Sequence, residues 1–232
     1  MKAHTKHTAI LLFANSAEED IRAKKLHADS GLLESLNQHV IKVIEATDLP
    51  HFHFSEKEQV GNSFGKRFVN AIQAIFDKGY LNVIAIGNDS PHLGKHHIQE
   101  ASKLLLQKKV VLGPSLDGGF YLLGITREHF DANGLESLPW QTSNLYQDTL
   151  AYFDSVACQL ATLETLSDID SIIDIKHLSN FAKTLSKNWL SLFSKMLKTK
   201  HRFISTIEIS PEILSRQNPF NKGSPVRFTQ LY

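Results

Sequence analysis

The chain has very few cysteines: Cys158 is the only one among its 232 residues, which excludes a framework of internal disulfides and is compatible with a reducing compartment. An excess of charge of one sign is also absent, because 25 Lys and Arg are balanced by 24 Asp and Glu. The composition therefore gives no argument for a nucleic-acid partner. No apolar run approaches the roughly 18 residues that a membrane span needs. Recognisable P-loop, Rossmann and Ser-His-Asp patterns are missing as well. What remains is an ordinary soluble globular chain, long enough for one large α/β domain and expected in the cytoplasm.

The first apolar run, residues 9–14, allows two interpretations. It follows Lys2 and Lys6, and positive residues before an apolar stretch imitate a signal peptide. The run is at or below the length that a signal peptide needs, however, and it equally makes a good first buried strand. We favour the strand.

The segment that organises the chain is the apolar run at residues 83–86, which stops at Gly87-Asn88-Asp89-Ser90-Pro91. An apolar run without alternation is typical of a strand buried on both faces, as in a parallel sheet. Gly87 and Pro91 break the run, so Asp89 is expected at the carboxyl end of the strand. That end is where open α/β sheets bind their ligands.

Strands and helices are predicted to alternate along most of the chain. Further strands are expected at 9–14, 51–54, 109–113, 119–125 and 158–163. Helices are expected at 31–46, at 95–107 and at 142–154, and another follows the segment 59–67 and ends at about residue 77. This alternation predicts a three-layer α/β fold with a mainly parallel sheet.

The C-terminal part has a different composition. Residues 175–207 contain no Asp or Glu but several Lys and Arg, and apolar residues recur at helical spacing between Phe181 and Leu197. We therefore expect one α/β domain over residues 1–181 and a basic amphipathic helix with an extension over residues 182–232. The helix either packs on the domain, which we favour, or docks a protein partner, a second copy of the chain or an anionic surface.

Asp89 and two acidic residues far downstream, Asp168 and Asp170, are candidates for a divalent metal site. Carboxylate oxygens suit Mg²⁺ or Mn²⁺, which neutralise the charge of substrate phosphates. The alternative is structural, with Asp89 ending a strand and Asp168 or Asp170 capping a helix.

Two other segments each allow two interpretations. The turn Asp117-Gly118-Gly119 either lets the backbone approach a ligand closely or simply joins two strands as a hairpin. Arg22, Lys24 and Lys25 follow the first predicted strand, where they either pair with phosphate oxygens or decorate a solvated surface.

Histidine and cysteine give weaker signals. With 12 histidines in the chain, we attribute the groupings His51 with His53 and His92 with His96 and His97 to chance rather than to a metal site. Cys158 lies in an apolar segment and is expected to be a buried core residue.

Several of these segments, taken in order, resemble a bacterial family of GT-A-type transferases known as radical-SAM/selenodomain-associated transferases, which is related to the nucleotidyltransferases of molybdopterin-type cofactor pathways. The resemblance covers residues 8–181. The matching positions are Gln59, Gly61, Gly65 and Arg67, then Ile86 to Pro91, Val111 to Pro114, Asp117 to Gly124, then Trp140, Thr142 and Thr149, and finally Asp168, Asp170 and Asp174.

The resemblance implies a GT-A-like α/β/α sandwich that binds a nucleotide or nucleotide-sugar together with Mg²⁺ or Mn²⁺. It implies that Asp89 and Asp170 are the catalytic carboxylates that hold the metal. The expected substrate-binding residues are Arg22, Lys24, Lys25, Gly65, Arg67, Asp117, Gly118 and Gly119.

The first loop departs from the family's pattern. The family has Pro, Gly and a basic run there, whereas this chain has Glu18, Glu19 and Asp20, and Ala23 replaces the first basic residue. Negative charge beside a phosphate site weakens nucleotide binding. Two hypotheses follow: a metal-dependent transferase that moves a glycosyl or nucleotidyl group, which we favour, and a catalytically degenerate GT-A-fold protein that acts as a binding or scaffold module. Ser63, where the family has an Asp, is a further departure.

Overall fold

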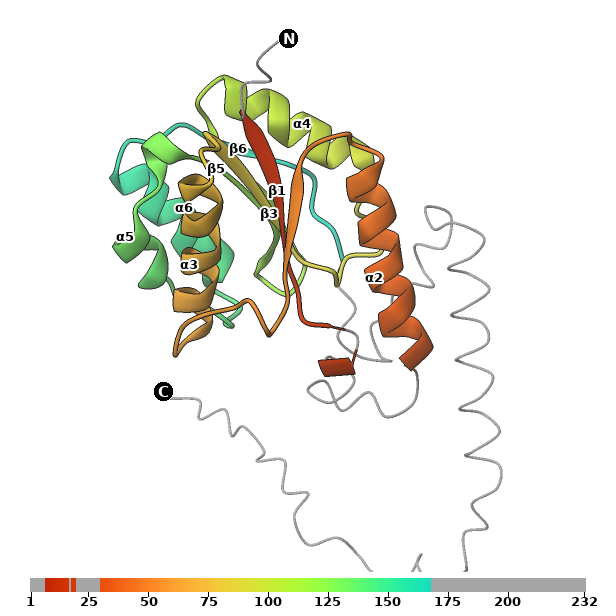
Figure 1. The fold of residues 1–232 in the computed structure, drawn as a ribbon. Coiled ribbons are helices and arrows are strands. Elements are labelled where there is room, and N and C mark those ends of the chain that lie inside the picture. Colours follow the sequence, from red (N-terminus) through yellow and green to blue (C-terminus); the bar gives the residue numbers. More distant parts are fainter. Residues whose placement is uncertain (1–6, 17, 20–29, 168–232) are drawn as a thin grey trace, which may run out of the picture. The chain divides into compact units, whose positions relative to one another are not determined.

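The computed structural model describes residues 7–16, 18–19 and 30–167 of the chain (Figure 1). All of them belong to the first of two units, Met1–Leu192. The second unit, Phe193–Tyr232, lies outside the described residues, as does the boundary predicted at residue 181. The division into two parts therefore stays a prediction.

The described chain contains six strands and five helices, together with one short 3-10 helix. The strands are β1 (Thr8–Phe13), β2 (His51–Phe54), β3 (Asn82–Ile86), β4 (Val110–Pro114), β5 (Phe120–Thr126) and β6 (Leu160–Thr162). The helices are α2 (Ser30–Glu45), α3 (Phe64–Asp77), α4 (Lys95–Leu106), α5 (Ala132–Glu136) and α6 (Leu145–Ser155), and the 3-10 helix is η1 (Arg127–His129).

The strands form one sheet in the order β2-β1-β3-β5-β4-β6. Neighbours pair in parallel except that β5 runs antiparallel to both β3 and β4. The sheet is thus mainly parallel, as the unbroken apolar run of β3 predicts. Because β5 reverses direction, its first residue lies at the edge of the sheet where β4 and the other parallel strands end.

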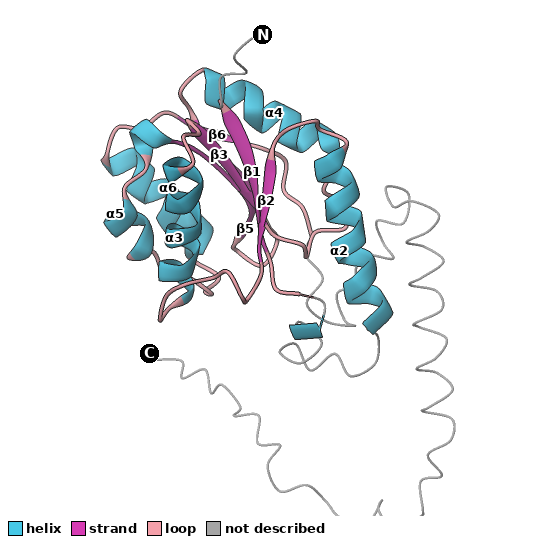
Figure 2. Cartoon of the chain, viewed as in Figure 1, coloured by secondary structure: helices cyan, strands magenta, loops and turns pink. Residues whose placement is uncertain are grey.

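Alternate residues of the strands supply two separate cores, one on each face of the sheet. In β1, Leu11 packs with α3, α5 and α6, while Ile10 packs with α2 and α4. In β3, Val83 belongs to the same core as Leu11, and Ile84 belongs to the same core as Ile10. Figure 2 shows the two groups of helices on opposite sides of the sheet. The prediction of a three-layer α/β/α sandwich is confirmed.

Local signals in the sequence explain where α3 begins and ends. Ser63 is its N-cap, and the Ser63 side chain accepts a hydrogen bond from the backbone N–H of Lys66. Gly79, with a φ of +92°, follows Lys78 at the other end. Ser63, where the sequence departs from the pattern of the family that it resembles, therefore has a structural role.

The C-terminal edge of the sheet differs most from expectation. The strand predicted at 158–163 is reduced to β6, three residues that are not fully buried. Cys158, expected in the core, is only half-buried at this edge and packs against the core from outside. Burial still raises the pKa of its thiol, which keeps it protonated and unreactive near neutral pH. Among the described helices, none has the length and apolar character needed to cross a membrane.

Candidate functional site

A cleft of about 430 Å³ opens at the edge of the sheet where the parallel strands end. It is lined by residues that follow β1 and β3, by the turn between β4 and β5, and by the first turns of α3 and α6. Asp89 and Asp117 both line it, although they are 28 positions apart in the sequence. The reversed direction of β5 brings them together, because it places the β4–β5 turn at the same edge as the end of β3.

Asp89 is half-buried in a loop that is held at three points. The side chain of Asn88 donates a hydrogen bond to Oδ1 of Asn37 on α2. Nε2 of His39, also on α2, donates to the carbonyl oxygen of Leu93, 2.9 Å away. At the end of the loop, the N–H of Gly94 donates to Nδ1 of His97 on α4, also at 2.9 Å. Helices on one face of the sheet thus fix the position of the Asp89 loop.

Asp117 organises the turn between β4 and β5. Its Oδ1 accepts a hydrogen bond from Oγ of Ser115 at 2.6 Å and another from the N–H of Gly119 at 2.9 Å. Gly118 has a φ of +92°, and a Cβ there would lie 2.0 Å from the carbonyl oxygen of Ser143. The hairpin interpretation of this segment is therefore correct, and the same hairpin places the Asp117 carboxylate and Gly119 in the wall of the cleft.

Arg67 is the only basic residue among the described residues that line the cleft. It is half-buried on α3, with its guanidinium carbon 6.0 Å from the centre of the Phe64 ring. No ion pair joins it to an acidic side chain of the described chain, whereas its neighbour Lys66 pairs with Glu136 at 2.8 Å. A cation without an internal counter-charge at the mouth of a cleft suits an anionic ligand.

Gly65 does not line the cleft itself. A Cβ at this position would lie 2.4 Å from Cδ1 of Trp140, so the glycine allows the indole ring to lie against α3. The indole N–H in turn donates to the carbonyl oxygen of Leu135 at 2.8 Å. Gly65, predicted as a substrate-binding residue, is seen to support a side chain that lines the cleft.

The cleft also has an apolar side that the sequence does not reveal, which we call the aromatic wall. Its members pack edge to face, stacked or tilted, with ring centres 4.9 to 6.4 Å apart. They come from β1, α3, β5 and the segment before α6, and no local sequence pattern connects these four segments. The aromatic wall consists of Phe13, Phe64, Phe68, Phe120 and Trp140.

Several predicted site residues lie outside the described part of the chain: Asp168, Asp170, Arg22, Lys24 and Lys25. Ser16, which precedes Arg22, Lys24 and Lys25 in the sequence, is described. The N–H and Oγ of Ser16 both donate to the carboxylate of Glu56, at 2.7 and 2.9 Å, and the hydrogen bond from the backbone of Ser16 lowers the pKa of Glu56. The Glu56 carboxylate thus accepts hydrogen bonds from two donors of Ser16, at the beginning of the first loop.

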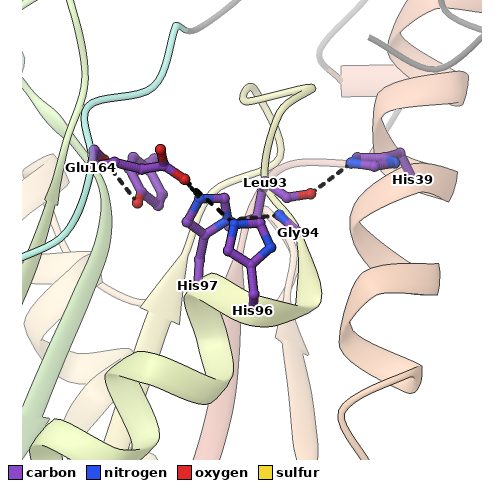
Figure 3. A network of polar contacts seen from close by, with 7 residues as sticks. His39, Leu93, Gly94, His96, His97 and Glu164 are labelled. Atoms are coloured by element: carbon purple, nitrogen blue, oxygen red, sulfur yellow. Dashed lines mark hydrogen bonds and ion pairs between the residues drawn. The ribbon is translucent and has the colours of Figure 1, made fainter. Parts of the chain in front are cut away.

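The histidines that the sequence grouped together lie in different environments. His51 is exposed, and His53 donates through Nε2 to the carbonyl oxygen of Ala14. His96 and His97 lie close to Glu164, a residue that no sequence motif pointed to (Figure 3). Hydrogen bonds from His97 and then from His96 lower the pKa of Glu164. Two of the three histidines in the grouping that we attributed to chance, His96 and His97, therefore belong to an ordered cluster, and His92 does not.

The residues of the cleft suit the divalent cation that the fold family implies. Asp89 and Asp117 present carboxylates, and Asn15 presents a side-chain amide in the same cleft. Such a set offers only hard oxygen ligands, which Mg²⁺ and Mn²⁺ prefer. Asp89 is the residue that would hold the ion from the end of β3.

Residues 37–142 match the model of a family described as "Uncharacterized protein conserved in bacteria (DUF2064)". The match is shorter than half of the chain, and it contains Arg67, Asp89 and the turn at Asp117. No curated protein sequence matches the chain.

A solved structure with the same fold is the "putative nucleotide-diphospho-sugar transferase" from Desulfovibrio desulfuricans G20. The similarity covers 85% of this chain and 96% of that one, with a TM-score of 0.67 and 21% sequence identity. At this identity the similarity shows the fold alone. The prediction of a GT-A-like architecture is confirmed, while the radical-SAM/selenodomain label stays a prediction.

Two further structures are similar at a lower level. One is Rv0371c from Mycobacterium tuberculosis H37Rv in complex with manganese, with 10% identity, a TM-score of 0.40, and coverage of 74% of this chain and 97% of that one. The other is a glycosyltransferase involved in the glycosylation of the major capsid of PBCV-1, with 12% identity, a TM-score of 0.44, and coverage of 68% and 82%. TM-scores below 0.5 carry no argument about this chain.

Proposed function

We propose that this protein is a metal-dependent transferase of the GT-A fold that moves a glycosyl or nucleotidyl group from a nucleotide-activated donor. The observation that carries the proposal is the composition of one cleft, which joins the Asp89 carboxylate, the Arg67 guanidinium and the aromatic wall. Each of the three matches a different part of such a donor: a metal-bound diphosphate, an anionic oxygen and a flat base or sugar face.

The metal would be Mg²⁺ or Mn²⁺, held by Asp89 and Asp170, and when bound it would neutralise charge on the donor phosphates. Arg67 would bind a phosphate oxygen from the α3 side of the cleft. The aromatic wall would pack against the base or sugar and exclude water from that side. Because catalysis in this class is mostly positioning and charge neutralisation, a nucleophilic side chain is not required.

Asp117 and its turn would face the acceptor. Its Oδ1 is held by Ser115 and Gly119, so the carboxylate has a fixed orientation on a rigid hairpin. A fixed carboxylate of this kind can accept a hydrogen bond from an acceptor hydroxyl and orient it toward the donor. Arg22, Lys24 and Lys25 remain proposed phosphate partners from the first loop.

A second candidate function is a binding or scaffold protein on the same fold, and the contact between Ser16 and Glu56 favours it. In the first loop, donors that would serve a phosphate are bound to an internal carboxylate, and Glu18 and Glu19 add further negative charge. Both features weaken phosphate binding near β1. A protein partner or self-association through residues 182–232 belongs to this second candidate.

The two candidates are separated by a thermal-shift screen of nucleotides and nucleotide-sugars with and without Mg²⁺ or Mn²⁺. A ligand at a hundred times its dissociation constant adds about 2.7 kcal/mol to the free energy of unfolding. We expect a metal-dependent increase in melting temperature with one nucleotide class, absent in Asp89→Asn and retained in the control Asp154→Asn, whose side chain is exposed on α6. A screen in which no nucleotide stabilises the folded protein would contradict the transferase and support the binding protein.

A further inference from the structure

His96, His97 and Glu164 bring three metal-binding side chains together outside the cleft (Figure 3). The two histidines lie in the first turn of α4, and Glu164 follows β6. Their ligand atoms lie within 4.8 Å of one another. Nε2 of His97 is 2.6 Å from Oε1 of Glu164, and Nε2 of His96 is 3.4 Å from the same oxygen. Two imidazole nitrogens thus converge on one carboxylate.

The cluster is ordered on one side and open on the other. The side chain of His97 is only 3% exposed, and its ring contacts Tyr121 edge to face at 5.9 Å. The hydroxyl of Tyr121 donates to the backbone carbonyl of Glu164 at 3.1 Å, which fixes the segment that carries the carboxylate. The side chains of His96 and Glu164 are 69% and 64% exposed. An ion can therefore enter from solvent and find one ligand already fixed.

The ligand atoms of this cluster favour a different metal from those of the cleft. Two imidazoles and one carboxylate form a set that zinc and neighbouring transition metals prefer, with a fourth position left for water. Mg²⁺ prefers all-oxygen surroundings such as those of Asp89 and Asp117. Tyr121 lines the cleft and also contacts His97 of the cluster, so one side chain adjoins both sites.

We propose that His96, His97 and Glu164 bind a divalent transition-metal ion, with zinc as the best match, at a site separate from the cleft. The site does not depend on the transferase function. The ion replaces the hydrogen that His97 now donates to Glu164, and the carboxylate and His96 complete the protein ligands.

The hydrogen bonds of His97 predict one particular structural change on ion binding. The N–H of Gly94 donates to Nδ1 of His97, so in the metal-free protein the hydrogen of the neutral ring is on Nε2. With a metal on Nε2, the neutral ring carries its hydrogen on Nδ1 and no longer accepts from Gly94. Ion binding therefore removes one hydrogen bond at the Gly94 end of the loop that carries Asp89, while the bond from the N–H of His97 to the carbonyl oxygen of Gly94, at 3.1 Å, remains.

The test is a zinc titration of the full chain, followed by competition with a chromophoric chelator. We expect one equivalent to bind to the wild type, and His96→Ala and Glu164→Gln to weaken binding at least tenfold. Both substituted residues are mostly exposed, so the variants should fold, which circular dichroism verifies. His51→Gln is the matched control, because it removes an exposed histidine elsewhere and should leave the affinity unchanged.

Three further measurements sharpen the result. Excess Mg²⁺ should not displace zinc, Co²⁺ should give a visible spectrum in the wild type but not in Glu164→Gln, and the backbone amide resonance of Gly94 should shift until one equivalent is bound. Absence of stoichiometric binding by the wild type, or equal affinities in all three variants, would overturn the proposed site. Binding without a change at Gly94 would overturn the proposed link to the Asp89 loop.

Discussion

Trp140 lies over Gly65 so closely that an added Cβ at residue 65 would be 2.4 Å from the indole ring. The contact joins the first turn of α3 to the segment before α6, two parts of the chain that both contribute side chains to the aromatic wall. It also gives a physical reason for the glycine at this position. The shape of the aromatic wall therefore depends on a residue that has no side chain.

The first prediction concerns Gly65→Ala. The added methyl group must displace Trp140, and overpacking of this kind costs about 1–3 kcal/mol, more than the gain of up to about 1 kcal/mol from alanine's helix propensity. We expect a lower free energy of unfolding in urea and a changed tryptophan emission spectrum. Gly87→Ala is the control, because a Cβ there meets no atom within 4 Å. Equal stabilities of the two variants would contradict the packing role of Gly65.

The second prediction concerns Arg67→Gln. A hydrogen bond between charged groups contributes about 1.5–3 kcal/mol, so removal of the guanidinium should weaken nucleotide binding about 10- to 100-fold. Stability should change little, because no acidic side chain of the described chain pairs with Arg67. Isothermal titration with the nucleotide found in the ligand screen gives the affinity.

Lys66→Gln is the matched control for Arg67. It removes the neighbouring cation, whose partner is Glu136 and whose side chain is 40% exposed. This partly exposed ion pair contributes little to stability, and the change should leave nucleotide affinity close to that of the wild type. If both variants bind equally well, Arg67 does not contact the phosphates.

The third prediction concerns the pH dependence of stability. Burial on α2 lowers the pKa of His39 below its usual value of 6.5, because the charged imidazolium loses water there. The unfolded chain therefore takes up a proton near pH 6.5 while the folded protein does not. The stability that His39 contributes is complete above pH 6.5 and is lost as the pH falls toward the lowered pKa.

The variant His39→Gln tests this prediction, since glutamine can still donate a hydrogen bond to the carbonyl of Leu93 but does not titrate. Urea unfolding between pH 5 and pH 8, in steps of about half a unit, should show a smaller loss of stability on the acid side than in the wild type. His92, whose pKa burial also lowers, accounts for part of the dependence that remains. Identical pH profiles of wild type and variant would contradict the assignment to His39.

The sequence predicted the fold well where a strand is covered on both faces. β1, β3 and β4 are buried along their whole length, so each appears as an uninterrupted apolar run. β6 has three partly exposed residues at the edge of the sheet and gives only a weak signal. Cys158 was misplaced for the same reason, since an apolar segment at an edge resembles one in the core.

The candidate site was predictable only where one short segment carries the chemistry. Asp89 and Asp117 each follow a strand, and breakers beside them mark the strand ends. The aromatic wall and the position of Glu164 depend on contacts between distant segments, such as Phe13 with Phe68 and His97 with Glu164. A single sequence contains no local signal for such contacts.

The last prediction concerns the aromatic wall. Phe64 lies at the start of α3 with its ring 5.4 Å from Trp140 and 6.3 Å from Phe68, so its ring has aromatic neighbours on more than one side. If a nucleobase stacks on this surface, loss of the ring should cost about 1–3 kcal/mol of binding free energy. Phe64→Leu keeps an apolar side chain of similar length, and we expect about 10- to 100-fold weaker nucleotide binding with little change in melting temperature.

Phe130→Leu is the control for this change. Phe130 is also half-buried and also packs against another phenylalanine, Phe76, but it does not line the cleft. Titration calorimetry should give wild-type affinity for Phe130→Leu, and tryptophan fluorescence should respond to ligand in this variant and in the wild type because Trp140 belongs to the wall. Wild-type affinity in Phe64→Leu would mean that the ligand does not stack on Phe64, and the search for the base would move to the Asn15 and Gln59 side of the cleft.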